Sequence, residues 1–348
     1  MKKIKIKICD FDPNVEISFG RFFLKRLEKF YEVELSEDPD YVFFYERSRD
    51  HLRFPEAIRI FYTGENVSPD FNMTDYSIGF DRLEFGDRHF RLPLYMVATL
   101  YDKKDIALAG DLTFERVEPM TREELSRKSG FCSFVYSNHL ADPRRKELLD
   151  ALSTYKKVDS GGKYLNNVGG PVEHKLLFES EHKFSIAFEN SSRAGYLTEK
   201  LPAALAARTI PIYFGDPEVG REFNVNRFIN ARNYPSFETV VERVKEIDQN
   251  DALYLEIVNQ PILAEGFHYS DTLDAFDRFL QNIFDQPLSS VKRRSINAAH
   301  TAQLEERDRR FFAARARIDR LRKLFSPLAR ISLLKNLKEQ VRQRLLHS

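Results

Sequence analysis

Tryptophan is absent from this chain of 348 residues, and cysteine occurs only twice. A secreted protein that is stabilised by disulfides usually carries more cysteines, so Cys9 and Cys132 favour a reducing compartment. Two cysteines and eight scattered histidines also fail to supply the ligands of a structural zinc site. We therefore expect an ordinary apolar core, for which 30 phenylalanines and 15 tyrosines supply a large area.

Long apolar runs are lacking as well. The longest run, at residues 92–101, is too short to span a bilayer and contains Pro93. The N-terminal sequence KKIKIKICDF alternates lysine with isoleucine, which is typical of a β-strand and not of the apolar centre of a signal peptide. We therefore expect neither a membrane-spanning helix nor a secretion signal.

A net excess of one charge is also missing, because the whole chain carries only +1. This balance argues against a protein that binds nucleic acid through its overall charge. The distribution is uneven, however. Residues 292–348 hold 16 basic and 5 acidic side chains, a net +11, which leaves −10 on the remainder. The asymmetry predicts a C-terminal segment with a role of its own.

Strand-like and helix-like patterns alternate along the chain. Apolar runs at Ile4–Cys9, Tyr41–Tyr45 and Ile58–Tyr62 predict strands, and a helical face recurs between the first two. The members of that face are Phe19, Phe22, Phe23, Leu27 and Phe30. Such alternation predicts a doubly wound α/β domain, and the length favours two domains.

The most informative segment is Phe184–Pro217, FSIAFENSSRAGYLTEKLPAALAARTIPIYFGDP. It reads as a strand, a polar loop, a helix from about Glu199 and a second strand at Ile210–Phe214. Thr198 is the expected N-cap of the helix, whose free N–H groups suit a phosphate. Ligands in such sheets bind beyond the carboxyl ends of the strands, where this loop lies.

This segment resembles the donor-binding motif of the family 10 glycosyltransferases, the α1,3/α1,4-fucosyltransferases that use GDP-fucose. The elements FEN, GY-TEK and IPIY-GDP stand where that family has them, and residues 61–81 (FYTGENVSPDFNMTDYSIGFD) resemble its acceptor-side motif. The resemblance implies an α/β fold of two Rossmann-like domains that face each other across a cleft, the GT-B fold. It also implies inversion at the sugar carbon and no obligatory cofactor or divalent metal.

The expected domain organisation follows from this resemblance and from the charge distribution. Residues 1–128 are expected to form the acceptor-side α/β domain. Residues 129–290 are expected to form the domain that binds GDP-fucose. Residues 291–348 are expected to form a basic, amphipathic helical tail, and a polar helix at residues 121–129 is expected to connect the two domains.

Glu65 is the expected general base. It follows the strand Ile58–Tyr62 after Thr63 and Gly64, so it should lie at the carboxyl end of that strand. The alternative is a solvated loop carboxylate. The resemblance places the family's general base at this glutamate, and an inverting transferase needs a carboxylate to take the proton of the acceptor hydroxyl.

Arg145 is the expected contact of the pyrophosphate. Asp142 and Pro143 predict a helix start, which puts Arg144 and Arg145 in the first turn. Cations are unfavourable there by about 0.3–1 kcal/mol, a cost that makes sense if an anion binds. The alternative is a pair of ordinary surface arginines. The resemblance selects Arg145, with Arg144 as the neighbour that is harder to exclude.

The other expected donor-binding residues come from the Phe184–Pro217 segment. They are Glu189, Asn190, Tyr196, Glu199 and Lys200. The family pattern gives Lys200 to the phosphates and Glu199 to hydroxyls of the donor. The alternatives are an exposed Glu-Lys pair at a helix end and loop residues that satisfy the backbone. Arg193 and Ala194 depart from the pattern, and we assign them no role.

No metal ligand is expected. Asp10 and Asp12 form a D-x-D sequence, which binds the cation in metal-dependent transferases of another fold. The motif is weak, since Asp38 and Asp40 form a second one, and the donor motif lies far away in the chain. We therefore do not assign these aspartates to a metal site.

The tail divides into two parts. Residues 304–325 are rich in arginine, and Ser326-Pro327 interrupts the helical pattern. Apolar residues then recur at steps of three and four, at Leu328, Ile331, Leu334, Leu337, Val341 and Leu345. This pattern predicts a basic amphipathic helix that binds an anionic membrane surface. The alternative is a helix that packs on the catalytic domain or on a second subunit.

The sequence therefore predicts an inverting fucosyltransferase that moves L-fucose from GDP-β-L-fucose to an N-acetyllactosamine-type acceptor, an oligosaccharide or a glycolipid. The resemblance fits a bacterial cytoplasmic enzyme, peripheral on the inner face of the membrane, that builds Lewis-type structures of a lipopolysaccharide. The alternatives are a GT-B transferase for another nucleotide sugar and a non-catalytic membrane-surface protein. No nucleic-acid partner is expected.

Overall fold

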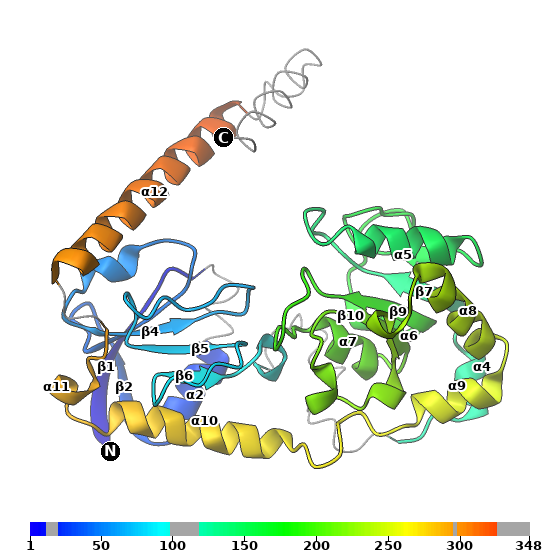
Figure 1. Cartoon of the computed structure of the whole chain (residues 1–348), viewed down its shortest axis with the longest axis horizontal. Helices are drawn as coiled ribbons and strands as arrows, with labels where there is room; N and C mark the ends of the chain where they lie inside the picture. The colour runs from blue at the N-terminus through cyan, green and yellow to red at the C-terminus, as the bar shows by residue number, and fades with distance from the viewer. Residues whose placement is uncertain (12–19, 98–117, 295–297, 326–348) are drawn as a thin grey trace.

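Two lobes, each built on a parallel β-sheet, stand side by side in the computed structural model (Figure 1). The structure describes residues 1–11, 20–97, 118–294 and 298–325. The expected architecture of two Rossmann-like α/β domains with a helical C-terminal region is confirmed. The division of the chain after residues 128 and 290 stays a prediction.

The first sheet holds six parallel strands in the order β2-β1-β3-β4-β5-β6. The strands are β1 (Lys2–Cys9), β2 (Tyr31–Leu35), β3 (Tyr41–Phe44), β4 (Ile58–Tyr62), β5 (Tyr76–Gly79) and β6 (His89–Arg91). The inner strands β3, β4 and β5 are buried along their whole length, as expected for parallel strands that are covered on both faces. The strands predicted at Tyr41–Tyr45 and Ile58–Tyr62 are thus confirmed.

The predicted helix between the first two strands is only partly present. The described residues form a π-helical turn η1 (Gly20–Leu24) and the short α2 (Lys25–Leu27), in which Phe23 and Leu27 are buried. Phe19 lies outside the described residues. Further short 3₁₀ turns of this lobe are η2 (Asp50–Arg53) and η3 (Leu94–Met96).

The second sheet holds five parallel strands in the order β11-β10-β9-β7-β8. The strands are β7 (Gly130–Phe134), β8 (Val158–Ser160), β9 (His182–Phe188), β10 (Ile210–Phe214) and β11 (Ile229–Asn230). The helices are α4 (Arg122–Ser126), α5 (Arg144–Ser153), α6 (Lys175–Ser180), α7 (Lys200–Ala206), α8 (Phe237–Asp248) and α9 (Asp251–Val258), with the 3₁₀ turns η4 (Val219–Arg221), η5 (Val225–Arg227) and η6 (Ala231–Asn233). A helix is present at the predicted position as α4, where Thr121 and Glu124 form a reciprocal capping box, and Leu125 packs in the core of the second lobe. Its role as the connection between the domains stays a prediction.

The order of the strands shows where each sheet can bind a ligand. In the second sheet, β7 lies between β8 and β9, so the chain passes from one side of β7 to the other. Ligands of open α/β sheets bind at such a switch point, beyond the carboxyl ends of the strands. Those ends carry Tyr136 and Asn138 after β7, and Glu189 and Asn190 after β9.

Helix α10 (Tyr269–Phe284) returns from the second lobe and runs along the base of the first (Figure 1). Its buried face carries Phe276, which contacts Phe23 with ring centroids 5.7 Å apart. Phe284 at its C-terminal end lies 4.4 Å from Tyr41. The helix therefore completes the core of the first sheet, and α11 (Leu288–Val291) follows it directly.

A buried carboxylate also ties the two lobes together. Glu222 of the second lobe is 2% exposed and pairs with Arg82 and Arg91 of the first, each at 2.6 Å. The hydroxyl of Tyr95 donates a third hydrogen bond to this carboxylate, at 2.5 Å. Because one carboxylate satisfies two guanidinium groups away from water, breaking this contact would leave buried charges unpaired.

Helix α12 (Ala298–Phe325) begins on the first lobe and then rises away from it (Figure 1). Its N-terminal half is docked, because Glu305 pairs with the buried Arg59 at 2.8 Å and Asp308 pairs with Arg49 at 3.0 Å. Farther along, Ile318 and Leu321 are about half exposed. The packing alternative is thus correct for the first half of α12, while the amphipathic segment predicted from residue 328 lies outside the described residues.

Candidate active site

Arg145 lies at the start of α5 with its guanidinium buried in the second lobe. The residue is 1% exposed, and its Nη2 donates to the Phe188 carbonyl at 2.9 Å and to Asn190 Oδ1 at 3.0 Å. The guanidinium carbon lies 3.8 Å from the centre of the Tyr136 ring. Within the described ranges no carboxylate pairs with Arg145, and its Nε has no hydrogen-bond partner. Such a cation is costly unless an anion joins it.

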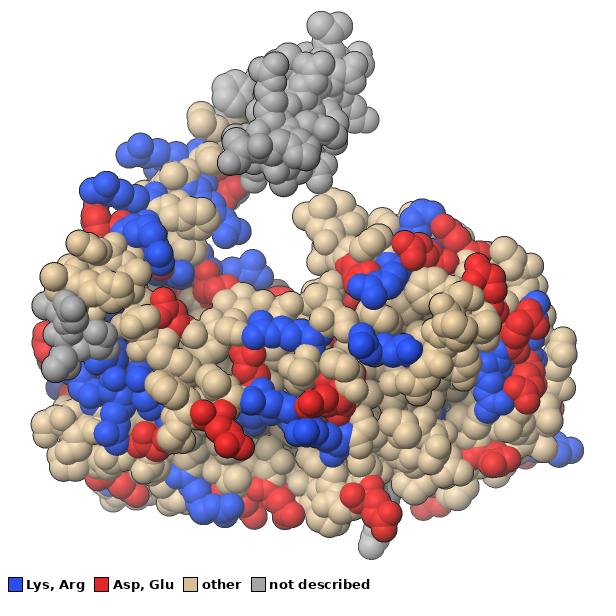
Figure 2. All heavy atoms as spheres, viewed as in Figure 1, with Lys and Arg blue, Asp and Glu red and all other residues tan. Residues whose placement is uncertain are grey.

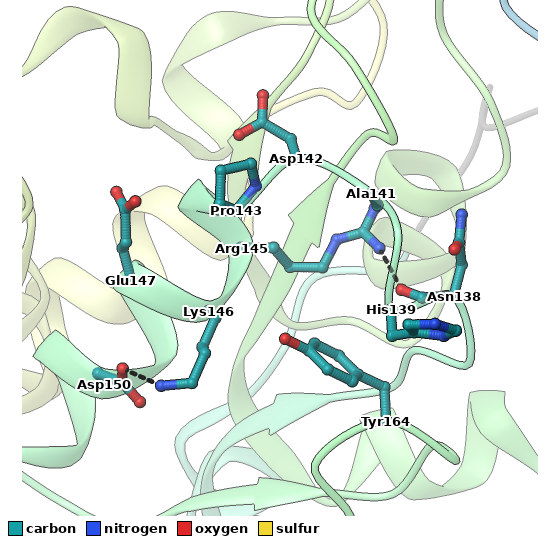
Figure 3. A pocket seen from close by; sticks show the side chains of 10 residues that line it. All are labelled: Asn138, His139, Ala141, Asp142, Pro143, Arg145, Lys146, Glu147, Asp150 and Tyr164. Carbon is teal, nitrogen blue, oxygen red and sulfur yellow. Dashed lines mark hydrogen bonds and ion pairs between the residues drawn. The ribbon is translucent and has the colours of Figure 1, made fainter. Parts of the chain in front are cut away.

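A pocket of about 300 Å³ opens beside this arginine (Figure 3). Figure 3 shows the guanidinium directed toward the backbone of Asn138, with Lys146 and Tyr164 nearby. The volume is at the lower end of the range for small-molecule sites. The lining residues are Asn138, His139, Ala141, Asp142, Pro143, Arg145, Lys146, Glu147, Asp150 and Tyr164.

Arg144, the neighbour in the sequence, has a different environment. Its guanidinium is 46% exposed and pairs with Asp142 at 2.7 Å. The Asp142 carboxylate also accepts from the Arg144 backbone N–H at 3.0 Å, as a residue that caps a helix does. Arg144 is therefore neutralised within its own turn, whereas Arg145 is not.

Lys200 occupies a second buried position, close to the end of β9. Its ammonium is 3.2 Å from Glu189 Oε2 and 3.3 Å from Glu199 Oε1. Burial opposes its charge, but the carboxylates of Glu189 and Glu199 outweigh burial and raise the pKa of Lys200. The ammonium also donates to the hydroxyl of Thr198 at 2.8 Å. Lys200 is thus held as a cation in a fixed position.

The two carboxylates around Lys200 have different exposures. Glu189 is fully buried, and its oxygens accept from the Thr198 backbone N–H at 2.8 Å and from the Thr198 hydroxyl at 2.6 Å. The Glu199 side chain remains 30% exposed. Partial burial opposes ionisation of Glu199, but Lys200 and Lys175 lower its pKa to about 2. Glu199 therefore presents a charged carboxylate that can accept hydrogen bonds from ligand hydroxyls, while Glu189 supports Lys200 from behind.

The expected N-cap of α7 is wrong. The helix begins at Lys200 with Glu199 in the N-cap position, and no side chain caps it. The Thr198 hydroxyl is unavailable for capping because it donates to Glu189 and accepts from Lys200. The local pattern assigns Thr198 to the cap, but its hydroxyl bonds instead to the buried Glu189 carboxylate beside the helix start.

Tyr196 and the glycine before it close the loop between β9 and α7. Tyr196 is 1% exposed, and its ring lies edge-on to Phe80 of the first lobe at 5.0 Å. Gly195 has a φ of +81°, and a Cβ there would come within 2.4 Å of the Phe80 carbonyl oxygen. Only glycine suits both the left-handed backbone and this close approach. The donor loop, defined as residues 189–198, is thus fitted against the first lobe.

Glu65 lies in a tight turn after β4, and the acceptor loop is defined as residues 63–68. The Glu65 N–H donates to the Thr63 hydroxyl at 3.0 Å, and the carboxylate is partly exposed. Burial raises the pKa of Tyr196, and the charge of Glu189 and, less strongly, that of Glu65 raise it further. Asn66, the residue after Glu65, donates to the Ser191 hydroxyl of the donor loop at 2.6 Å, so the expected base lies beside that loop.

Sequence reasoning missed Glu46, which follows β3 beside this turn. The Thr63 hydroxyl lies 3.4 Å from Glu46 Oε2. Burial raises the pKa of Glu46 to about 7, and the charge of Glu65 adds to the effect. The position of Glu46 could have indicated this site, because β3 and β4 are neighbours and their carboxyl ends share one edge of the sheet.

Two further residues were missed in the second lobe. The Tyr136 ring packs against Arg145, and its hydroxyl donates to the Ile186 carbonyl at 2.7 Å. Arg193, to which the sequence gave no role, forms an ion pair with Asp81 at 2.6 Å. Tyr136 stands at the end of β7 and could have been selected by position, whereas nothing in the sequence marks the partner of Arg193.

Of the D-x-D aspartates, Asp10 has its carboxylate engaged by partners within the first lobe. Asp10 is buried, and its carboxylate accepts from His51, from the Ser48 hydroxyl and from the Asp50 N–H. Asp12 lies outside the described residues. In the described part of the chain, no group of three His, Cys, Asp or Glu side chains is placed to hold a metal ion. No helix of that part is long and apolar enough to cross a membrane.

Two parallel-sheet lobes with charged groups beyond the ends of their strands have the architecture of the GT-B class of glycosyltransferases. Residues 6–98 match the model of the N-terminal domain of α-(1,3)-fucosyltransferase FucT, and residues 125–259 match the model of the C-terminal part of glycosyltransferase family 10, the fucosyltransferases. A crystal structure of an α1,3-fucosyltransferase with GDP-fucose is 30% identical, with a TM-score of 0.64 over 81% of this chain and 91% of that one. The chain therefore belongs to glycosyltransferase family 10.

Two relatives show how far the similarity extends. The α-(1,3)-fucosyltransferase FucT of Helicobacter pylori is 36% identical over 257 residues, which are 68% of this chain and 52% of that protein. The human α-(1,3)-fucosyltransferase 4 is 33% identical over 135 residues, which are 37% of this chain and 25% of that protein. The chain thus spans about half the length of the bacterial relative and a smaller part of the human one.

The raised pKa of Glu46 predicts a pH dependence of stability. An unfolded glutamate titrates near its ordinary value of 4.5, so the folded state binds the extra proton between that pH and about 7. Its stabilising contribution is complete below pH 4.5 and is lost as the pH rises through 7. At about 1.4 kcal/mol for each tenfold change in proton binding, the rise from 4.5 to about 7 gives a loss of at most roughly 3.5 kcal/mol.

We therefore expect Glu46→Gln to raise the melting temperature at pH 8 relative to wild type and to leave it nearly unchanged at pH 5. Gln keeps the shape of the neutral carboxyl without its charge. The groups that face Glu46 are Glu65, Tyr45, Tyr62 and Arg47. Glu84→Gln, at an exposed site of the same lobe, serves as the control in melting curves from pH 5 to 8. Parallel curves for wild type and Glu46→Gln would contradict the assignment.

Proposed function

We propose that this protein is an inverting fucosyltransferase that transfers L-fucose from GDP-β-L-fucose to a hydroxyl of an N-acetyllactosamine-type glycan, in α1,3 or α1,4 linkage. Its membership of family 10 supports the class of reaction. The observation that carries the donor assignment is the buried Arg145, a cation that lacks a carboxylate partner among the described residues and stands beside a pocket at the switch point of the second sheet.

In the proposed donor site, two buried cations bind the diphosphate. Arg145 and Lys200 hold the diphosphate and stabilise the negative charge that develops on it as the bond to fucose breaks, the term that usually dominates such catalysis. Tyr196 and Asn190 shape the site, Glu189 keeps Lys200 in place, and Glu199 accepts hydrogen bonds from donor hydroxyls. In this proposal the protein supplies the positive charge, and no divalent metal is needed.

The proposed acceptor site lies against the first lobe. The acceptor hydroxyl attacks the anomeric carbon of fucose, while Glu65 takes its proton and GDP leaves with the electrons of the broken bond. The β-linked donor becomes an α-L-fucoside in a single displacement, without a covalent enzyme intermediate. The acceptor is an oligosaccharide or a glycolipid, as in the synthesis of Lewis-type glycans on a lipopolysaccharide, and the enzyme acts in the cytoplasm.

Glu65→Gln tests the general base. General-base catalysis contributes on the order of 10²–10⁴-fold, so the variant should lose that much of the transfer rate and keep its affinity for GDP-fucose. Transfer is measured with an N-acetyllactosamine acceptor, and NMR of the product gives the linkage. Glu84→Gln should behave as wild type, and turnover of Glu65→Gln close to wild type would remove Glu65 from this role. A panel of other nucleotide sugars tests the donor.

Arg145→Met tests the phosphate contact, with Arg144→Met as the matched control. Hydrogen bonds to charged groups contribute about 1.5–3 kcal/mol, so Arg145→Met should weaken GDP binding by roughly 10- to 150-fold. Guanosine binding should remain nearly unchanged, and Arg144→Met should bind both ligands as wild type does. Calorimetry is done with excess EDTA, so a requirement for a metal would appear as lost binding in the wild type. An equal loss for guanosine and GDP would show that Arg145 does not act on the phosphates.

We also propose that the tail brings the enzyme to an anionic membrane surface. Basic side chains follow one another along the described part of α12 (Figure 2), and the amphipathic pattern continues from residue 328. Each Lys or Arg near an anionic surface contributes about 1 kcal/mol, and an apolar stripe adds burial at the headgroups.

Deletion of residues 326–348 should release the protein from vesicles that contain anionic lipid and leave turnover on soluble acceptors intact. The deletion removes five basic residues and one acidic residue, so partitioning should fall at least tenfold. A longer deletion, of residues 298–348, also removes Glu305 and Asp308 and should lower the melting temperature, since Arg59 loses its partner. Equal vesicle binding by the wild type and the variant that lacks residues 326–348 would contradict the membrane proposal.

A further inference from the structure

Arg193 of the donor loop contacts three side chains of the first lobe, two of which belong to the acceptor loop. Its Nη2 pairs with Asp81 at 2.6 Å and donates to the Ser68 hydroxyl at 2.5 Å. Its Nη1 donates to Asn66 Oδ1 at 3.3 Å, and its guanidinium carbon lies 5.0 Å from the centre of the Phe80 ring. One side chain of the second lobe therefore contacts two residues that follow Glu65 in the acceptor loop, and also Asp81.

A neighbouring hydrogen bond also joins the acceptor loop to the donor loop. The Asn66 amide donates to the Ser191 hydroxyl of the donor loop at 2.6 Å, so Asn66, next to Glu65, is bonded to both ends of the Ser191–Arg193 stretch. On the other side, the Tyr196 N–H donates to the Arg193 carbonyl at 3.1 Å. Arg193 thus connects the neighbour of Glu65 with Tyr196, beside the contacts of Arg91 with Gly195 and of Phe80 with Tyr196.

These contacts are not what holds the lobes together. The lobes are tied by the buried Glu222 and by the apolar core that includes Phe276. The Arg193 side chain is 41% exposed, and exposed ion pairs contribute only about 0–1 kcal/mol to stability. The contacts of Arg193 are therefore too weak to matter much for folding, but they are well placed to orient the acceptor loop.

We propose that Arg193 is a positioning residue that holds the acceptor loop against the donor loop, and thereby sets how donor is divided between transfer to the acceptor and hydrolysis by water. The inference rests on the proposed transfer reaction. When Glu65 is held in place, it takes the proton of the acceptor hydroxyl as that oxygen bonds to the anomeric carbon of fucose and the bond to GDP breaks. When the loop is displaced, a water molecule attacks the same carbon instead, its proton passes to solvent, GDP leaves, and free fucose is released.

Arg193→Ala tests this role through kinetics. A displacement of about 1 Å can cost on the order of 10²-fold in rate, so kcat for transfer should fall by roughly 10- to 100-fold. Hydrolysis of GDP-fucose without acceptor should fall much less, so the ratio of hydrolysis to transfer should rise. GDP affinity should stay within about twofold of wild type, and the melting temperature should hardly change, because an exposed ion pair contributes little.

Three further variants make the result specific. Asp81→Asn should shift the ratio in the same direction, because it removes the charge that Arg193 pairs with. Arg193→Lys should recover part of the activity, since it keeps the charge but lacks the fork that reaches two partners. Arg232→Ala is the matched control, because Arg232 donates to Ser192 of the same loop at 2.7 Å but from within the second lobe. It should leave the ratio unchanged.

The outcomes distinguish a failure of the proposed function from a failure of the proposed role of Arg193. A wild-type protein that neither transfers nor hydrolyses GDP-fucose would contradict the proposed function. An active wild type together with an unchanged kcat and an unchanged ratio in Arg193→Ala would overturn the positioning role alone. A loss of GDP binding in Arg193→Ala would also overturn it, since the residue would then act on the donor.

Discussion

The second lobe is built around one buried cation, the guanidinium group of Arg145, which has no carboxylate among its described neighbours. Arg145 is held by two carbonyl oxygens, by an amide oxygen and by the face of an aromatic ring, and none of these carries a full negative charge. An isolated buried cation is expensive, and an anionic ligand is the partner that offsets the cost. The strands, the helix start and the pocket around Arg145 serve to hold this charge where such a ligand can reach it.

The second cation of the site is organised differently. Lys200 is surrounded by two carboxylates, so it is already paired before any ligand arrives. Because Glu189 is fully enclosed and Glu199 is partly open, a ligand that approaches Lys200 also meets the Glu199 carboxylate. The neighbourhood of Arg145 thus suits a negatively charged group, while the neighbourhood of Lys200 suits a ligand that has both charge and hydroxyl groups. A sugar nucleotide has both.

The parts of the fold that depend on local pattern were predictable from the sequence. Ile58–Tyr62 and Ile210–Phe214 form strands with the expected bounds, because buried parallel strands need continuous apolar runs. The motifs selected Arg145 and Lys200, which the structure buries in the second lobe, and Glu65, which follows β4; the roles assigned to these residues stay predictions. Contacts between distant segments were not predictable. Thr198 was expected to cap a helix and instead bonds to Glu189, which lies nine residues away. Arg193 finds its partner 112 residues away, and no local pattern encodes that distance.

The path of α10 has a consequence for how the chain folds during synthesis. The first sheet is complete once β6 has been made at Arg91, yet Phe276 and Phe284 fill its core only about 190 residues later. At typical rates of about 5–20 residues per second, this face waits for roughly 10–40 s before its covering helix emerges from the ribosome. The N-terminal lobe therefore spends that interval without the helix that covers the aromatic side chains of its core. A fragment that ends before α10 would remain in this state permanently.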